Sequence, residues 1–136
     1  MNTVIQTIIQ RKSVRAYEKR LIGDETKNEI IRAALRAPTA GNMMLYSIIE
    51  VSDQAKKDIL ANSCDNQPFI AKAPLVLLFL ADYQRWHDYF VTCGVDKADS
   101  PMRKPREGDL LLACCDAIIA AQTAVVAAES LGIGSC

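Results

Sequence analysis

The sequence predicts an α+β domain in which short strands are embedded in a mainly helical chain. The segment 46–51 is rich in β-branched residues, which is typical of a strand. The segment 75–81 is a continuous apolar run, which predicts a strand buried on both faces. From about Gly108 to Leu131 the chain is apolar on nearly every side, which predicts one long helix buried on most of its surface. In a chain of 136 residues, that much buried helix indicates a second subunit.

Two helices are expected in the first forty residues. Thr3 and Gln6 have the spacing of a capping box at the start of the first helix. Its apolar face is formed by Val4, Ile5, Ile8 and Ile9. Asp24 is predicted to cap the second helix, which must end before Pro38 because the residue before a proline disfavours helical angles. The stripe expected to be buried on this second helix consists of Ile30, Ile31, Ala34 and Leu35.

The middle of the chain predicts two further helices. The first spans 53–61 with Ile59 and Leu60 directed inward, and an irregular polar segment follows at 62–69. The second spans 83–90, where Trp86 and Phe90 lie four residues apart and are expected to dock the helix on the core. An alternative is that these aromatic side chains cover a flat ligand.

Two other features of this region carry little functional information. His87 is the sole histidine, and no partner for acid–base chemistry is identifiable in the sequence. The segment 92–108 is expected to be a loop, and its cations are Arg103, Lys104 and Arg106. We interpret this run as a solvated loop; a role in attracting a phosphorylated nicotinamide cofactor is the alternative.

Composition excludes several classes of function. The chain has 16 basic and 16 acidic residues, which argues against nucleic acid as the main partner. Its five cysteines show no Cys-x-x-Cys spacing, so neither a disulfide framework nor a metal site is suggested. The N-terminus lacks a secretion signal, and Asp116 would make a membrane span at 110–128 costly. We therefore expect a cytoplasmic protein that does not enter a membrane.

Three polar segments are candidates for binding a ligand. Arg11, Lys12, Ser13 and Arg15 combine guanidinium, ammonium and hydroxyl donors, which suits an anion such as a phosphate. The segment 37–42 (Ala-Pro-Thr-Ala-Gly-Asn) follows a predicted helix, and its glycine allows close approach of the backbone to a ligand. The third segment, 132–136 (Gly-Ile-Gly-Ser-Cys), directly follows the predicted long helix.

These segments, in this order, resemble the motifs of the nitroreductase family of flavin mononucleotide (FMN) enzymes. The resemblance covers nearly the whole chain and implies a three-layer α/β/α sandwich with a central, mostly antiparallel sheet and a long helix at a homodimer interface. FMN would lie between the two subunits. The cofactor-binding residues that the resemblance implies are Arg11, Lys12, Ser13 and Arg15 from one subunit, and Pro38, Thr39, Ala40, Asn42 and Met44 from the other.

The reaction implied by the resemblance has two half-reactions at one site. NADH or NADPH reduces the flavin, and an electron-poor small molecule, such as a nitroaromatic or a quinone, is then reduced. The cofactor carries this chemistry, so no protein nucleophile, acid–base pair or metal is expected.

Two features depart from the family pattern. Many relatives have Gln-Pro-Trp or a similar sequence where this chain has Met43-Met44-Leu45, so an amide contact to the flavin edge is not expected. Relatives also continue beyond the position of Cys136 with a segment that contacts the flavin. Residues 1–136 are therefore expected to form a single nitroreductase-like domain truncated at its C-terminus. The alternative function is a dimeric module that binds flavin weakly or is not catalytic.

Overall fold

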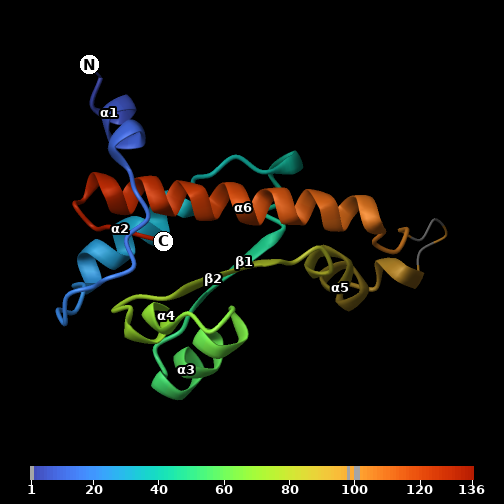
Figure 1. Cartoon of the computed structure of the whole chain (residues 1–136). Helices are drawn as coiled ribbons and strands as arrows, with labels where there is room; N and C mark the ends of the chain where they lie inside the picture. The colour runs from blue at the N-terminus through green and yellow to red at the C-terminus, as the bar shows by residue number, and fades with distance from the viewer. Residues whose placement is uncertain (1, 98, 100–101) are drawn as a thin grey trace.

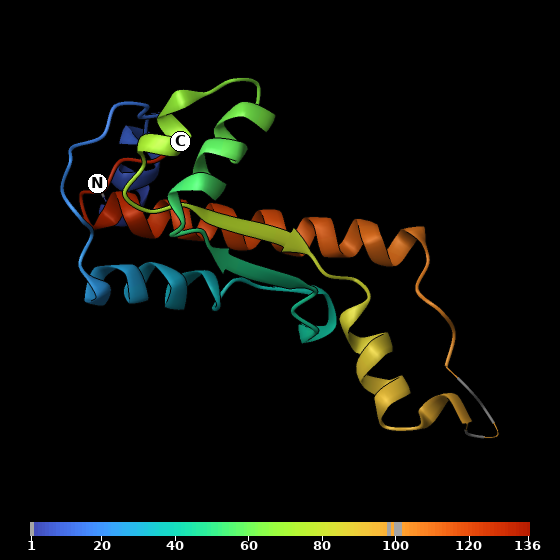
Figure 2. The same cartoon turned by 90° about the horizontal axis from the view of Figure 1, so that it is seen from below.

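The computed structural model of the chain describes residues 2–97, 99 and 102–136, and it confirms the α+β class (Figure 1). In chain order the elements are α1 (Thr3–Gln10), α2 (Asp24–Ala34), η1 (Ala40–Asn42), β1 (Tyr46–Glu50), α3 (Gln54–Ser63), α4 (Pro68–Lys72), β2 (Leu77–Ala81), α5 (Arg85–Thr92), η2 (Val95–Lys97) and α6 (Glu107–Ser130). The helix α6 runs along one side of the strands with α2, while α3 and α4 lie on the other side (Figures 1 and 2).

Strands β1 and β2 pair antiparallel, with Ile48 opposite Phe79. These two side chains pack against the buried residues of α2 and α6. On the other face Ile49 is 45% exposed and Leu80 is 42% exposed. The two predicted strands are therefore confirmed, but the prediction that 75–81 is buried on both faces is wrong for this chain.

Helix α6 has two faces of different character. Its buried residues recur at helical spacing and are nearly all small: Ala113, Asp116, Ala117, Ala120, Ala124 and Ala128. Small side chains let α2 and β2 approach closely, and α6 packs against both. The larger Leu111 and Ile118 lie on the opposite face and are 65% and 67% exposed. Within one chain α6 is therefore covered on one face, and the predicted burial on most sides relies on a second subunit.

By length and hydropathy alone, α6 is one helix that would be able to cross a membrane. Its small-residue face is instead used inside the fold, where it meets α2 and the strands. Asp116 lies in the middle of that face and binds backbone amides of a distant loop. This is the arrangement expected of a core helix.

The N-terminal helices begin one residue away from the predicted caps. The Asn2 side chain, and not Thr3, accepts a hydrogen bond from the Val4 amide at the start of α1. Gly23 occupies the cap position of α2, and Asp24 is its first helical residue. On α1 the four apolar residues are at least half exposed, from 51% for Ile5 to 65% for Ile9. The helix projects from the end of the molecule where α6 finishes (Figure 1).

Several side-chain placements on α2, α3 and α5 also differ from expectation. Ile30 and Ala34 are buried as predicted, but Leu35 is 45% exposed at the C-terminus of α2. Ile59 is 65% exposed, and the residues of α3 that are buried are Lys57 and Ala61. The segment 62–69, predicted to be irregular, ends in the first residues of α4.

The aromatic helix α5 does not dock on the core. Trp86 and Phe90 are each 38% exposed and pack on each other and on Tyr89. The helix extends beyond the end of the strands, at the end of the molecule where α6 begins (Figure 2). The prediction failed because four-residue spacing identifies a shared face but not what that face packs against.

Candidate cofactor site

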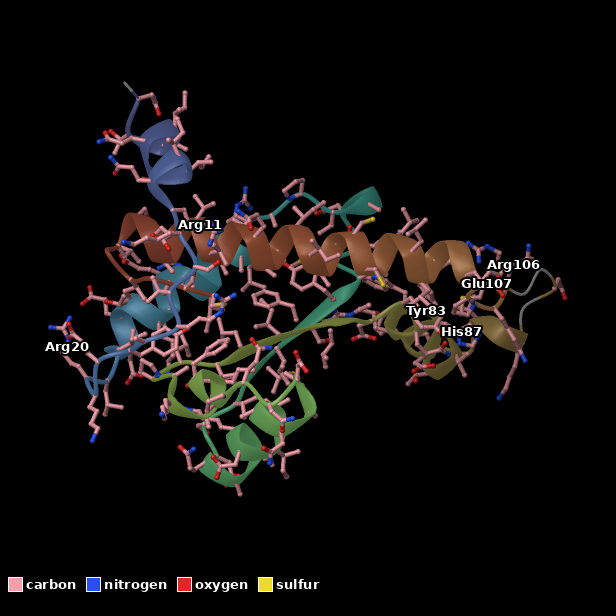
Figure 3. All side chains as sticks on the ribbon, viewed as in Figure 1. Arg11, Arg20, Tyr83, His87, Arg106 and Glu107 are labelled. Carbon is pink, nitrogen blue, oxygen red and sulfur yellow. The ribbon has the colours of Figure 1, made fainter. Side chains whose placement is uncertain are left out.

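The cationic segment 11–15 lies beside the C-terminal half of α6. Arg11 lines a small hollow with Gln122, Val126 and Glu129, and Figure 3 shows it next to this part of the helix. The segment is fixed by the end of the chain, because the Val14 amide donates a 2.9 Å hydrogen bond to the Ser135 carbonyl. Ser13 and Ser135 form a parallel bridge. Two of the three predicted segments therefore lie side by side.

Gly134 is required for this contact. A Cβ atom at position 134 would lie 2.7 Å from Cγ2 of Val14, which is closer than two carbon atoms can approach. The glycine thus allows the tail to lie directly against the cationic segment. This gives a structural reason for the second glycine of the Gly-Ile-Gly-Ser sequence that follows the long helix.

The cations of this segment are available to bind an anion. Across the part of the chain that the structure describes, no carboxylate lies within ion-pair distance of Arg11, Lys12 or Arg15. The Arg15 guanidinium lies over the Phe69 ring, 5.8 Å from its centroid, which keeps its charge while limiting its movement. Ser13 is exposed beside them. These donors match the chemistry of a phosphate group.

The polar loop 38–45 has an unusual backbone. Gly41, Asn42 and Met44 all have left-handed φ angles, of 57°, 56° and 50°. Such angles are unfavourable for Asn and more so for Met, so other contacts must hold them. Within the loop, Thr39 contributes one such contact, since its hydroxyl oxygen accepts a 3.3 Å hydrogen bond from the Met44 amide.

Three side chains from other elements hold the loop. Asp116 of α6 accepts hydrogen bonds from the amides of Ala40 (3.0 Å) and Leu45 (3.2 Å). Arg85 of α5 donates to the carbonyls of Met44 (2.9 Å) and Tyr46 (2.8 Å).

The neighbouring indole completes these contacts, as Trp86 donates a 2.7 Å hydrogen bond to the Met43 carbonyl. Arg85 and the Asp116 contacts were not identified as site features from the sequence, and Trp86 was considered only as part of an aromatic cover over a flat ligand. The signal available for Asp116 was a lone carboxylate in an Ala-rich apolar helix. For Trp86 the signal was the aromatic cluster at 83–90, and for Arg85 the sequence offers no comparable signal.

The predicted ring-contacting residues lie at different depths. Asn42 and Pro38 are exposed, while Thr39 and Ala40 are partly buried. Met44 packs against a buried cluster that includes Tyr46 and Ala117. Burial raises the pKa of the Tyr46 phenol, and the Asp116 carboxylate raises it further. An open hollow of about 450 Å³ adjoins the loop, and its lining includes Asn42, Met44 and Trp86.

One chain does not bring the two groups of predicted residues together. The cationic segment lies near position 126 of α6, whereas the loop is held at position 116. Ten residues of helix separate these points, about 15 Å at 1.5 Å per residue. Within one chain, the two groups of predicted residues therefore contact α6 at separate positions.

The remaining polar residues lie elsewhere. Tyr83, His87 and Arg106 are at the opposite end of α6 from Arg11, and Arg20 lies at the tip of the loop before α2 (Figure 3). Arg103 forms an ion pair with Asp109, which also accepts from the Arg106 amide at the start of α6. Arg103 and Arg106 thus organise the beginning of the helix.

The chain is similar to a known protein family and to several of its members. The family model described as "Nitroreductase family" matches residues 8–136. An FMN reductase [NAD(P)H] of Bacillus subtilis is 33% identical over 144 residues, covering 99% of this chain and 53% of the relative. The chain thus spans about half the length of the curated relatives it matches.

Two solved structures are also similar to this chain in both fold and sequence. Nitroreductase A from Vibrio parahaemolyticus matches with a TM-score of 0.87 and 30% identity, over 98% of this chain and 53% of that one. The NADPH:FMN oxidoreductase of Vibrio harveyi complexed with NAD⁺ matches with a TM-score of 0.82 and 31% identity, over 98% and 54%.

Proposed function

Because this chain belongs to the nitroreductase family, we propose that it takes part in an FMN-dependent NAD(P)H oxidoreductase whose cofactor site is built by two copies of the chain. One observation carries the proposal. The cations at 11–15, which have no carboxylate partner among the described residues, suit a phosphate, and the held loop at 38–45 suits a ring. The two groups contact α6 of one chain at positions about 15 Å apart.

The donor set fits FMN at its phosphate end. Arg11, Lys12 and Arg15 have no carboxylate partner among the described residues, and an FMN phosphate supplies the missing negative charge. Ser13 adds a neutral hydroxyl for the phosphate or the ribityl chain. In this proposal the cations bind and orient the cofactor and take no part in proton transfer.

The loop of the other copy would contact the ring. Pro38, Thr39, Ala40, Asn42 and Met44 would line it, with the exposed Asn42 amide as a polar contact and the Met44 side chain as an apolar one. When bound, FMN would supply the redox chemistry, taking hydride from NADH or NADPH and passing electrons to a small electron-poor acceptor such as a nitroaromatic or a quinone. The chain's residues would bind and orient the cofactor and exclude water from its face.

The outer face of α6 supports a homodimer. Leu111 and Ile118 are two-thirds exposed on a face that also carries Cys115, and the apolar face of α1 is open as well. Exposed apolar surfaces of this extent mark interaction sites in soluble proteins. Association of two copies through α6 would cover them. We propose that the dimer acts in the cytoplasm.

Spectroscopy of the purified chain tests the proposal. FMN should bind, and NADH or NADPH added without oxygen should bleach the flavin absorbance, which a quinone should restore. A chain that acquires no flavin at saturating FMN would contradict the proposal. Flavin that binds but is not bleached by either nicotinamide would indicate a binding module without activity.

A further inference from the structure

We propose that Asp116 is a positioning residue that holds the loop 38–45 in the shape that receives the flavin ring, a role that rests on the proposed function. The carboxylate is only 2% exposed, yet it belongs to a helix whose other buried residues are alanines. A charged group in such a place is costly unless every oxygen is well bonded. Its presence at the centre of α6 therefore calls for a specific use.

Both oxygens of Asp116 are used on the same loop. Oδ1 accepts from the Ala40 amide at 3.0 Å, and Oδ2 accepts from the Leu45 amide at 3.2 Å. These amides lie on either side of the residues with left-handed φ angles. The carboxylate thus fixes both ends of the six-residue arc 40–45, within which Gly41 and Asn42 are exposed.

Helix α5 completes the arrangement from the carbonyl side. Arg85 donates to the carbonyls of Met44 and Tyr46, and Trp86 donates to that of Met43. A carboxylate therefore binds two amides of the loop, and a guanidinium and an indole bind carbonyls of the same loop. Within this set Asp116 is the buried member and the one that bonds both ends, so its replacement should have the clearest effect.

The variant Asp116→Asn removes the charge and one acceptor oxygen while keeping the size and shape of the side chain. An amide of the same shape keeps one acceptor oxygen, but its NH₂ group faces a second N–H donor and leaves that donor without a partner. FMN affinity should fall roughly five- to hundredfold, the range expected for one unsatisfied buried donor. At saturating FMN the bound flavin should also show an absorbance spectrum closer to that of free flavin.

Lys57→Met provides a matched control for general destabilisation. Lys57 is also buried, at 8% exposure, and its ammonium donates to the Ala73 carbonyl at 3.0 Å on α3, away from the loop. This variant should lose stability but keep the FMN affinity and flavin spectrum of the wild type. An equal loss of affinity in both variants would overturn the positioning role.

Amide hydrogen exchange, measured in the flavin-free chain, tests whether Asp116 holds the loop without requiring that FMN binds. In the wild type, the amides of Ala40 and Leu45 should exchange more slowly than that of exposed Gly41 between them. In Asp116→Asn at least one of the two should exchange roughly tenfold faster or more. If the wild type binds no FMN, the proposed function fails, and the exchange rates alone decide whether Asp116 holds the loop.

Two results would overturn the inference directly. The first is fast exchange at both amides in the wild type, which can be measured even if Asp116→Asn does not fold. The second is an Asp116→Asn chain that folds, loosens the loop and still binds FMN with wild-type affinity.

Discussion

Arg11 and Ser13 are the residues on which the phosphate assignment depends most directly. Replacing both with alanine should weaken FMN binding, because loss of one charge-assisted hydrogen bond costs about 1.5–3 kcal/mol. The matched control is Arg20→Ala, which removes the same charge from an exposed loop tip away from the segment (Figure 3). Fluorescence titration with FMN measures both. Equal affinity for the Arg11→Ala/Ser13→Ala variant and the control would remove the phosphate role.

At the residue scale, the sequence indicated candidate site residues only where those residues are adjacent in the chain. Arg11, Lys12, Ser13 and Arg15 are visible as a group because they are adjacent. Asp116 is not, because its two amide partners lie 76 and 71 residues earlier in the chain. A carboxylate in an apolar helix can be recognised as unusual from sequence, but its partners require the folded structure.

At the scale of elements, the contact between the chain's two ends depends on Gly134. Gly134→Ala should destabilise the chain by about 1–3 kcal/mol, because the added methyl overlaps Val14 and forces the two segments apart. The matched control is Gly108→Ala in the first turn of α6, where no atom lies within 4 Å of the added carbon. That change should be neutral or stabilising. Urea denaturation compares the two, and equal stability would contradict the tight contact.

The start of α6 should respond to pH through Asp109. The Arg103 guanidinium and then the Arg106 amide lower the pKa of the Asp109 carboxyl well below its usual value. Because the folded pKa is depressed, the resulting stabilisation is present above the ordinary carboxyl pKa of about 3.9 and is lost as the pH falls through the lowered value.

Arg103→Ala should therefore move the Asp109 titration, followed by carbon-detected NMR, upward towards the ordinary value. Lys104→Ala removes a neighbouring cation that does not contact Asp109 and should leave the titration unchanged. A titration midpoint that is the same in wild type and Arg103→Ala would show that the pair does not form in solution.

Sequence patterns predicted where helices and strands form better than they predicted which other elements cover each face. The β-branched segment and the continuous apolar run became β1 and β2, in agreement with their short length and their composition. For α6, apolar residues on nearly all sides were interpreted as burial on most sides, with a second subunit covering part of the helix. In the folded chain the alanines face inward, and Leu111 and Ile118 face outward. Hydrophobicity alone does not say whether the same chain or another copy covers a face.

At the scale of the whole molecule, Ile118 tests the association of two chains. Ile118→Asp places a charge on the outer face of α6 and should give monomers that bind FMN weakly, because a desolvated charge at an interface is unfavourable. Ile59→Asp is the matched control, since Ile59 is 65% exposed on α3 and Ile118 is 67% exposed. Size-exclusion chromatography with light scattering reports the mass. A dimer that persists in Ile118→Asp would place the interface elsewhere.

Sedimentation velocity of the wild-type chain with FMN, followed by flavin absorbance, tests the shared site most directly. The flavin should sediment with a species of twice the chain mass, and dilution to monomer should release it. Flavin that sediments with a single chain, or that does not sediment with protein at all, would contradict a cofactor site built by two copies.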